Sequence, residues 1–172
     1  MLLKRIVVGP LEENCYILTK DNETIIIDPG DEFEKIDKEI EGRLIGIIIT
    51  HHHFDHIGAL EELKNKYNVP IIDFNNQKKL EPFKYEILEN PGHTRDSISI
   101  YFKEENIMFC GDFIFKGTIG RTDLPTGNME EMKNSIKNLL TLNENIILYP
   151  GHYENTTIKN EKVNLEYILK LY

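Results

Sequence analysis

The apolar residues of this chain fall into short runs, separated by polar turns and by segments with a helical period. β-branched and aliphatic runs predict strands at residues 5–8, 15–19, 24–27, 45–49, 69–72, 85–88, 98–102, 107–109 and 146–149. Apolar residues that recur every three or four positions predict helices over residues 34–41, 55–66, 75–80, 129–140 and 157–171. This mixture of strands and intervening helices favours a layered α/β architecture.

The connections between these elements are short, with one exception. Residues 20–23 and 103–106 have the composition of hairpin turns. Residues 117–128 form a longer segment rich in Gly, Thr and Pro, and long loops in compact domains often serve a site. No internal repeat or linker-like stretch divides the chain. We therefore expect a single domain over residues 1–172.

Charge and cysteine usage narrow the classes of partner and compartment. The formal net charge of -9 argues against binding to nucleic acid, which leaves a basic footprint. No apolar run approaches 18 residues, and the N-terminus lacks the pattern of a signal peptide, so we expect neither a membrane span nor secretion. Cys15 and Cys110 lie in or beside apolar runs, which favours buried thiols and a cytoplasmic location. The oligomeric state is left open by the sequence.

Four of the six histidines lie within residues 51–56, directly after an apolar strand. Alternate residues of a strand point the same way, so His51 and His53 can converge on one metal ion while His52 faces elsewhere. We therefore leave His52 out of the site. Asp55 and His56 follow at the end of the strand, where they can hold a second metal ion.

The other two histidines share a second local pattern. His93 and His152 each follow a Pro-Gly pair after an apolar strand. Asp112 likewise follows a glycine, Gly111, after an apolar strand. The glycine permits a sharp turn, and the strand anchors a ligand-type side chain at its end. In one division, His51, His53 and His93 bind the first metal. Asp55, His56 and His152 then bind the second, and Asp112 bridges the two. Nitrogen and oxygen donors suit zinc, iron or manganese.

These motifs resemble a known family in their order and form. They are Thr-His-His-His-Phe-Asp-His-Ile-Gly, Pro-Gly-His-Thr, Phe-Cys-Gly-Asp-Phe-Ile-Phe and Gly-Arg-Thr-Asp-Leu-Pro-Thr-Gly, and they span most of the chain. Together they resemble the metallo-β-lactamase fold superfamily and, within it, the short bacterial members of the glyoxalase II-like branch. The resemblance implies a four-layer αββα sandwich, in which two mixed β-sheets carry helices outside and a metal site along one edge.

The resemblance also implies roles for individual residues. It assigns two divalent metal ions, zinc or else iron or manganese, to the seven ligands named above, with Asp55 and Asp112 also catalytic. Asp28, in Ile-Ile-Asp-Pro-Gly, occupies the place of an Asp that does not bind the metal itself but hydrogen-bonds a residue that does. An Asp before Pro-Gly also suits a turn. Arg121 falls where a basic residue contacts the thiol carrier of the substrate, although a solvated loop Arg would fit the same position.

The function implied is metal-dependent hydrolysis of a small-molecule thioester such as S-hydroxyacyl-glutathione, by a hydroxide that bridges the two metals. Glyoxalase II has a C-terminal helical domain that binds glutathione, and we expect no such domain here because the sequence ends soon after His152. A hydrolase of another ester or lactone therefore stays open. The resemblance also allows a persulfide dioxygenase of the same superfamily, which shares Gly-Arg-Thr-Asp and would hold one iron on His51, His93 and Asp112, or a catalytically silent metal-binding module.

Overall fold

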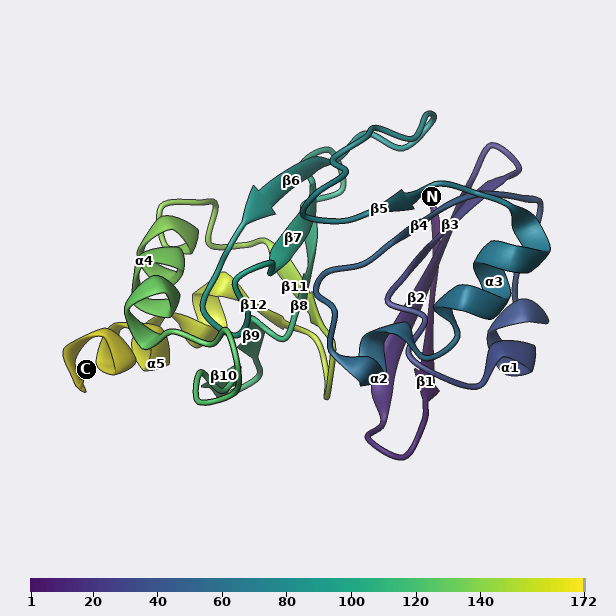
Figure 1. Cartoon of the computed structure of the whole chain (residues 1–172). Helices are drawn as coiled ribbons and strands as arrows, with labels where there is room; N and C mark the ends of the chain where they lie inside the picture. The colour runs from purple at the N-terminus through teal and green to yellow at the C-terminus, as the bar shows by residue number, and fades with distance from the viewer. Residues whose placement is uncertain (172) are drawn as a thin grey trace. The chain divides into compact units, whose positions relative to one another are not determined.

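The computed structural model describes residues 1–171, which form two compact units that divide after Lys84. The first unit is built on a mixed five-stranded sheet with the order β1-β2-β3-β4-β5 (Figure 1). Its strands are β1 (Leu2–Val8), β2 (Glu13–Lys20), β3 (Glu23–Ile27), β4 (Arg43–Ile48) and β5 (Ile71–Ile72). The first three strands pair antiparallel, whereas β3, β4 and β5 run parallel. Three helices accompany them: α1 (Phe33–Asp37), α2 (Phe54–Ile57) and α3 (Leu60–Tyr67).

The hairpin between β2 and β3 turns at Asp21 and Asn22. Both residues have positive φ, 51° and 63°, the conformation that a tight two-residue turn requires and that Asp and Asn adopt more readily than most residues. The predicted turn at residues 20–23 is therefore confirmed. Apolar side chains of the strands and of α1 and α3 form one buried cluster in this unit, including Ile17, Ile47 and Leu63.

The helix predicted over residues 55–66 is interrupted at Gly58. The Gly58 amide donates to the Gly30 carbonyl at 2.9 Å, and the Ala59 amide donates to the Pro29 carbonyl at 3.0 Å. A Cβ at Gly58 would lie 2.1 Å from the Gly30 oxygen. The chain therefore breaks into α2 and α3 because its backbone bonds to the loop after β3 instead of continuing one helical ladder.

The helix predicted over residues 75–80 is wrong. The Asp73 carboxylate accepts hydrogen bonds from the Asn75 and Asn76 amides, both at 2.9 Å, and Asp73 and Asn76 form an isolated β-bridge. An Asp side chain that bonds its own backbone two and three residues on favours a turn over a helix. The polar composition of Asn75-Asn76-Gln77 gave no apolar face to oppose this preference.

The second unit has its own mixed five-stranded sheet, with the order β12-β11-β8-β7-β6. Its strands are β6 (Glu86–Glu89), β7 (Ile98–Phe102), β8 (Ile107–Gly111), β11 (Ile147–Pro150) and β12 (Thr156–Thr157). The pairs β6–β7, β7–β8 and β11–β12 are antiparallel, and β8–β11 is parallel. A two-stranded ribbon, β9 (Ile114–Phe115) with β10 (Thr118–Ile119), and the helices α4 (Met129–Leu139) and α5 (Ile158–Leu171) complete the unit (Figure 1).

Helix α4 begins where the sequence predicts. The Asn128 side chain caps it by accepting from the Glu130 and Glu131 amides, at 2.9 and 3.1 Å. Its apolar residues Met132, Ile136 and Leu139 join the buried cluster of the second unit. The i, i+4 and i+7 spacing of these three residues explains why the periodicity identified the helix correctly.

The predicted class of two mixed β-sheets with helices is confirmed by the elements of the two units. Helix α1 is shorter than predicted, and the short strands β9, β10 and β12 were not predicted, since two residues carry no periodic signal. Among the described residues, no helix combines the length and the apolarity that crossing a membrane requires. Cys15 and Cys110 are buried thiols, as the sequence predicts. The single domain stays a prediction.

Candidate metal centre

Parallel pairing of β3 with β4 brings two polar segments of the first unit together. The strands align Ile27 with Ile48, and their carboxyl ends therefore lie at one edge of the sheet. The Asp28 amide continues the pairing by donating to the Ile48 carbonyl at 3.0 Å. Asp28 follows β3 with a positive φ of 50°, and His51 lies three residues beyond β4. The sheet thus presents a carboxylate beside the histidine-rich segment.

The buried Asp28 carboxylate binds residues at both ends of the histidine-rich segment, Thr50 before it and His56 at its end. It accepts from the Thr50 amide at 2.7 Å, from the Thr50 hydroxyl at 2.6 Å and from His56 Nδ1 at 3.0 Å. Because the Thr50 hydroxyl donates to Asp28, it can accept from His51 Nδ1, which lies 3.2 Å away. Both imidazoles are then oriented through Nδ1, which leaves Nε2 as the nitrogen available to a metal.

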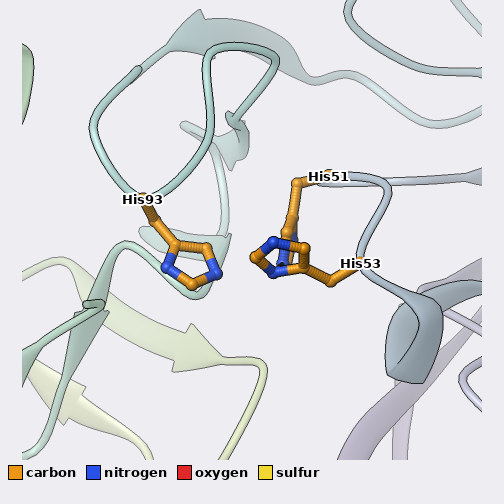
Figure 2. A group of neighbouring side chains, drawn as sticks. All are labelled: His51, His53 and His93. Carbon is orange, nitrogen blue, oxygen red and sulfur yellow. Dashed lines mark hydrogen bonds between the residues drawn. The ribbon is translucent and has the colours of Figure 1, made fainter. Parts of the chain in front are cut away.

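His51 and His53 fit one metal ion. The His51 Nε2 and His53 Nδ1 atoms lie 3.1 Å apart, and the rings meet edge to face (Figure 2). Two nitrogens bound tetrahedrally at about 2.0–2.1 Å from zinc are separated by roughly 3.3 Å, so the observed spacing matches a shared cation. The donor atoms of Asp28, His51 and His56 likewise lie within 4.8 Å of one another. Asp55 Oδ2 lies 3.9 Å from His56 Nε2.

His52 lies apart from this group, as strand alternation predicts. Its side chain is 40% exposed, and Nε2 lies 3.4 Å from Asp73 Oδ2. It therefore interacts with the turn after β5 instead of the Asp28 cluster.

Glu13, at the start of β2, was missed by sequence reasoning. It is 1% exposed, and its Oε1 lies 3.7 Å from His56 Nδ1. Gly30 permits this approach, since a Cβ there would lie 2.5 Å from Glu13 Oε2. Burial raises the pKa of the nearby Cys15 thiol well above its usual value, and the charges of Glu13 and Asp28 raise it further. A single Glu ahead of an apolar run gave no signal that the carboxylate would be buried.

The second unit carries three more of the predicted ligands at one sheet edge. The parallel strands β8 and β11 end at Gly111 and Pro150, and the Gly151 amide donates to the Gly111 carbonyl at 2.9 Å. His152 Nε2 and Asp112 Oδ2, which follow these strands, lie 3.7 Å apart. His93 Nε2 lies 3.5 Å from the same Asp112 oxygen. Asp112 therefore lies between two imidazoles of the second unit.

His93, on the loop after β6 (Figure 2), is oriented by backbone. Its Nδ1 donates to the Arg121 carbonyl at 2.7 Å, which leaves Nε2 for a metal. Gly120 allows this packing, because a Cβ there would lie 3.2 Å from the His93 Cβ and only 1.8 Å from the Asp112 carbonyl oxygen. The motif around Arg121 thus positions a predicted ligand through its main chain, a role that sequence reasoning did not identify.

The Arg121 side chain has a different partner. Its guanidinium forms a bidentate pair with Asp123, at 2.7 and 2.8 Å, on the exposed surface of the loop. Hydrogen bonding to Arg121 lowers the pKa of Asp123 to about 2. The same pair raises the pKa of Arg121. Both groups therefore stay charged at neutral pH, and the guanidinium already binds a carboxylate.

The donor chemistry fits divalent metal ions. Asp28 and Glu13 bring two carboxylates close to the buried His56, and a cation would offset this charge where water has little access. One ring nitrogen of His56, His51 and His93 is held by Asp28, Thr50 and the Arg121 carbonyl, respectively. The opposite nitrogen of each ring is left to bind a metal, as is typical of metal-binding imidazoles. This His and Asp set suits a binuclear site of zinc, iron or manganese.

Comparison with known proteins agrees with this interpretation. The family model of the Metallo-beta-lactamase superfamily matches residues 8–78 and 72–152. The chain is 35% identical to the hydroxyacylglutathione hydrolase GloC of Haemophilus influenzae, over 94% of this chain and 95% of that protein.

Two solved structures share the fold. BLEG-1 B3 metallo-beta-lactamase superposes with a TM-score of 0.90 at 29% identity, over 97% of this chain and 99% of that one. TTHA1623 in a di-iron-bound form gives a TM-score of 0.82 at 29% identity, over 92% and 96%. The predicted resemblance is confirmed: this chain belongs to the metallo-β-lactamase superfamily, as a hydrolase related to the glyoxalase II-like branch.

Proposed function

We propose that this chain is a binuclear metal-dependent hydrolase that acts on a thioester such as S-hydroxyacyl-glutathione. The observation that carries the metal-dependent part is the orientation of three imidazoles. Asp28 holds His56, Thr50 holds His51, and the Arg121 carbonyl holds His93, each through the nitrogen opposite the one offered to a metal. Similarity to the GloC hydrolase over nearly the whole chain supports the thioester part.

We assign the metals to the ligands that the sequence predicts: His51, His53 and His93 for one ion, Asp55, His56 and His152 for the other, and Asp112 for both. When bound, two such ions polarise a carbonyl and lower the pKa of water to about 7. We assign zinc, with iron or manganese as the next choices. Iron is a choice because TTHA1623, which shares the fold, has been solved in a di-iron-bound form.

The chain's own groups have separate tasks in this proposal. Asp112, 3.5 Å from His93 Nε2 and 3.7 Å from His152 Nε2, keeps the donors on the second unit together and can accept a proton at Oδ2. Asp55 is the other carboxylate at hand for proton transfer. The Arg121 guanidinium would bind a carboxylate of the thiol carrier, in exchange for Asp123.

The proposed setting is the cytoplasm, with a small-molecule thioester as the partner and neither nucleic acid nor membrane. Two observations support it. Both cysteines are buried thiols, which suits a reducing compartment. The net charge of -9 disfavours a polyanionic partner but tolerates a small anion that a single Arg can bind.

The test is metal content together with turnover. The protein is purified without a histidine tag, its metals are counted by elemental analysis, and S-lactoylglutathione hydrolysis is followed before chelation, after chelation and after return of zinc, iron or manganese. Close to two metals per chain and chelator-sensitive turnover are expected. Full turnover in metal-free protein would overturn the mechanism.

Two parallel assays distinguish the hydrolase from its rivals. A chromogenic cephalosporin tests whether this chain shares the activity that the name of BLEG-1 implies. Oxygen uptake with glutathione persulfide tests the dioxygenase. A single iron per chain, persulfide-dependent oxygen uptake and no thioester turnover would replace the hydrolase proposal.

A further inference from the structure

A pocket of about 500 Å³ lies within the second unit, between the sheet and helix α4. Its lining combines apolar side chains, such as Leu88 of β6, Met108 of β8 and Leu139 of α4, with short polar ones, such as Ser135 and Thr141, and includes none of the predicted metal ligands. Ligand pockets for small molecules typically measure about 300–1,000 Å³ and are mostly apolar with a few polar groups. The size and composition of this pocket therefore suit a small organic molecule.

One polar group in the pocket wall lacks a partner. Asn90, directly after β6, is 4% exposed. Its backbone amide donates to the Ser97 carbonyl at 3.0 Å, and its side-chain oxygen accepts from the Ser99 hydroxyl at 2.7 Å. Its side-chain nitrogen Nδ2 is buried and finds no acceptor among residues 1–171. Buried donors in proteins are nearly always paired, so this amide is prepared for an acceptor that the protein does not supply.

The charge of the lining restricts the ligand further. Of the described residues that line the pocket, Glu89 is the one with an ionisable side chain. Its carboxylate disfavours an anion, and a ligand that satisfies Asn90 must offer an acceptor. The apolar part of the lining favours apolar contact, and its other polar residues, Ser99, Ser135, Asn138 and Thr141, are uncharged. An uncharged, largely apolar molecule with a carbonyl or ester oxygen meets all three conditions.

We propose that this pocket is a binding site for such a molecule, whose carbonyl oxygen accepts a hydrogen bond from Asn90 Nδ2. The site stands independently of the proposed hydrolase function. It nevertheless adjoins the segment that carries His93. The Ser135 hydroxyl, on the pocket side of α4, donates to the Pro91 carbonyl at 2.7 Å, and the Asn128 amide donates to the Gly92 carbonyl at 2.8 Å.

The four methionines give the test a site-specific readout. In protein labelled with ¹³C at the methionine methyl groups, Met108 reports on the pocket wall and Met1, in the other unit, serves as the internal control. The probes are acetophenone, its isostere α-methylstyrene, which has a methylene group in place of the carbonyl oxygen, and benzoate. Acetophenone should shift the Met108 signal saturably and leave Met1 unchanged. Its affinity should exceed that of α-methylstyrene by about three- to tenfold, the value of one hydrogen bond.

Two variants complete the test. Asn90→Ala should bind the two neutral probes equally, since the donor is gone. Asn138→Trp, at an exposed position of α4 that lines the pocket, should abolish the Met108 shift by filling the mouth, whereas Asn134→Trp, an exposed position one turn earlier that does not line it, should not. Circular dichroism checks folding. If Asn90→Ala does not fold, the proposal is still tested by probe binding to the wild type and by the comparison of Asn138→Trp with Asn134→Trp.

Three results would overturn the proposal. The first is a Met108 signal that no probe shifts. The second is equal binding of acetophenone and α-methylstyrene by the wild type, which would remove the role of Asn90. The third is tighter binding of benzoate than of acetophenone, which would contradict the ligand class.

Discussion

His56 Nδ1 lies 3.0 Å from Asp28 Oδ2, with both side chains buried in the first unit. One partner follows a central strand of the sheet and the other lies in a short helix, so this single hydrogen bond fixes an imidazole that the local sequence alone could not orient. Asp28 also accepts two hydrogen bonds from Thr50, and the same carboxylate therefore stabilises the strand end that carries His51.

Replacement of Asp28 by Ala should weaken metal binding by about 10- to 100-fold, because His56 and Thr50 lose the acceptor that orients them. Competition with a chromogenic chelator measures the affinity. Asp21→Asn, in the exposed hairpin turn of the same unit, is the matched control and should bind metal like the wild type. Unchanged affinity in Asp28→Ala would mean that the carboxylate serves the turn alone.

Replacement of Gly58 by Ala should destabilise the fold by about 2–3 kcal/mol, the upper part of the range for overpacking, because the site cannot yield. The new Cβ would meet the Gly30 carbonyl oxygen at 2.1 Å, and that atom belongs to the backbone. Urea unfolding measures the difference. Gly117→Ala, with open space around it but a φ of +81°, should cost about 1 kcal/mol through backbone strain alone. A smaller loss at Gly58 than at Gly117 would contradict the steric explanation.

The pKa of Cys15 should make the free energy of unfolding fall at alkaline pH. Its folded-state pKa is raised by burial, so the unfolded chain gives up this proton first as the pH rises. The contribution is fully present below the unfolded-state pKa of about 8.5 and is progressively lost as the pH rises above it. Unfolding of wild type and Cys15→Ala is compared from pH 7 to 10. The difference between them should narrow with pH, and parallel curves would contradict the assignment.

Arg121 should affect substrate binding without affecting the metals. If the proposed function holds, Arg121→Ala raises KM for S-lactoylglutathione about tenfold through loss of a charge-assisted hydrogen bond. Asp123→Asn lowers KM, because the guanidinium no longer has a competing carboxylate. Metal content should not change in either variant, since His93 bonds to the backbone carbonyl of residue 121. Arg95→Ala, an exposed Arg of the His93 loop, is the control.

The sequence predicted most of the elements because apolar spacing decides them. The periodic faces of α4 and α5 and the turn residues Asp21 and Asn22 are local signals, and the structure follows them. The predictions that were wrong have two causes: the turn at Asp73 comes from side-chain bonds to near neighbours, and the break in the helix at Gly58 comes from a distant residue. Nothing within residues 55–66 indicates that the Gly30 carbonyl accepts from Gly58 and divides the helix.

The candidate site likewise divides into features that the local sequence reveals and features that only the fold creates. The motifs identify the ligand-type residues, because histidines and aspartates at strand ends have few structural reasons to recur. Glu13 was not predicted to belong to the site, because its contact with His56 exists only once the sheet has folded. The role of the Arg121 carbonyl is likewise invisible in sequence, since every residue has a carbonyl and only the fold decides which one a histidine meets.

The parallel pairing of β8 with β11 also bears on how the protein is made. These strands are neighbours in the sheet but are separated along the chain by the ribbon of β9 and β10 and by α4, whereas β1, β2 and β3 pair with their immediate successors. During synthesis the N-terminal hairpins can close early, because local contacts form fast. Asp112 must wait for β11 to leave the ribosome before it can meet His152. A nascent chain therefore carries only part of the proposed ligand set through most of translation, and under that proposal a metal bound at that stage would be held by fewer donors than the finished protein offers.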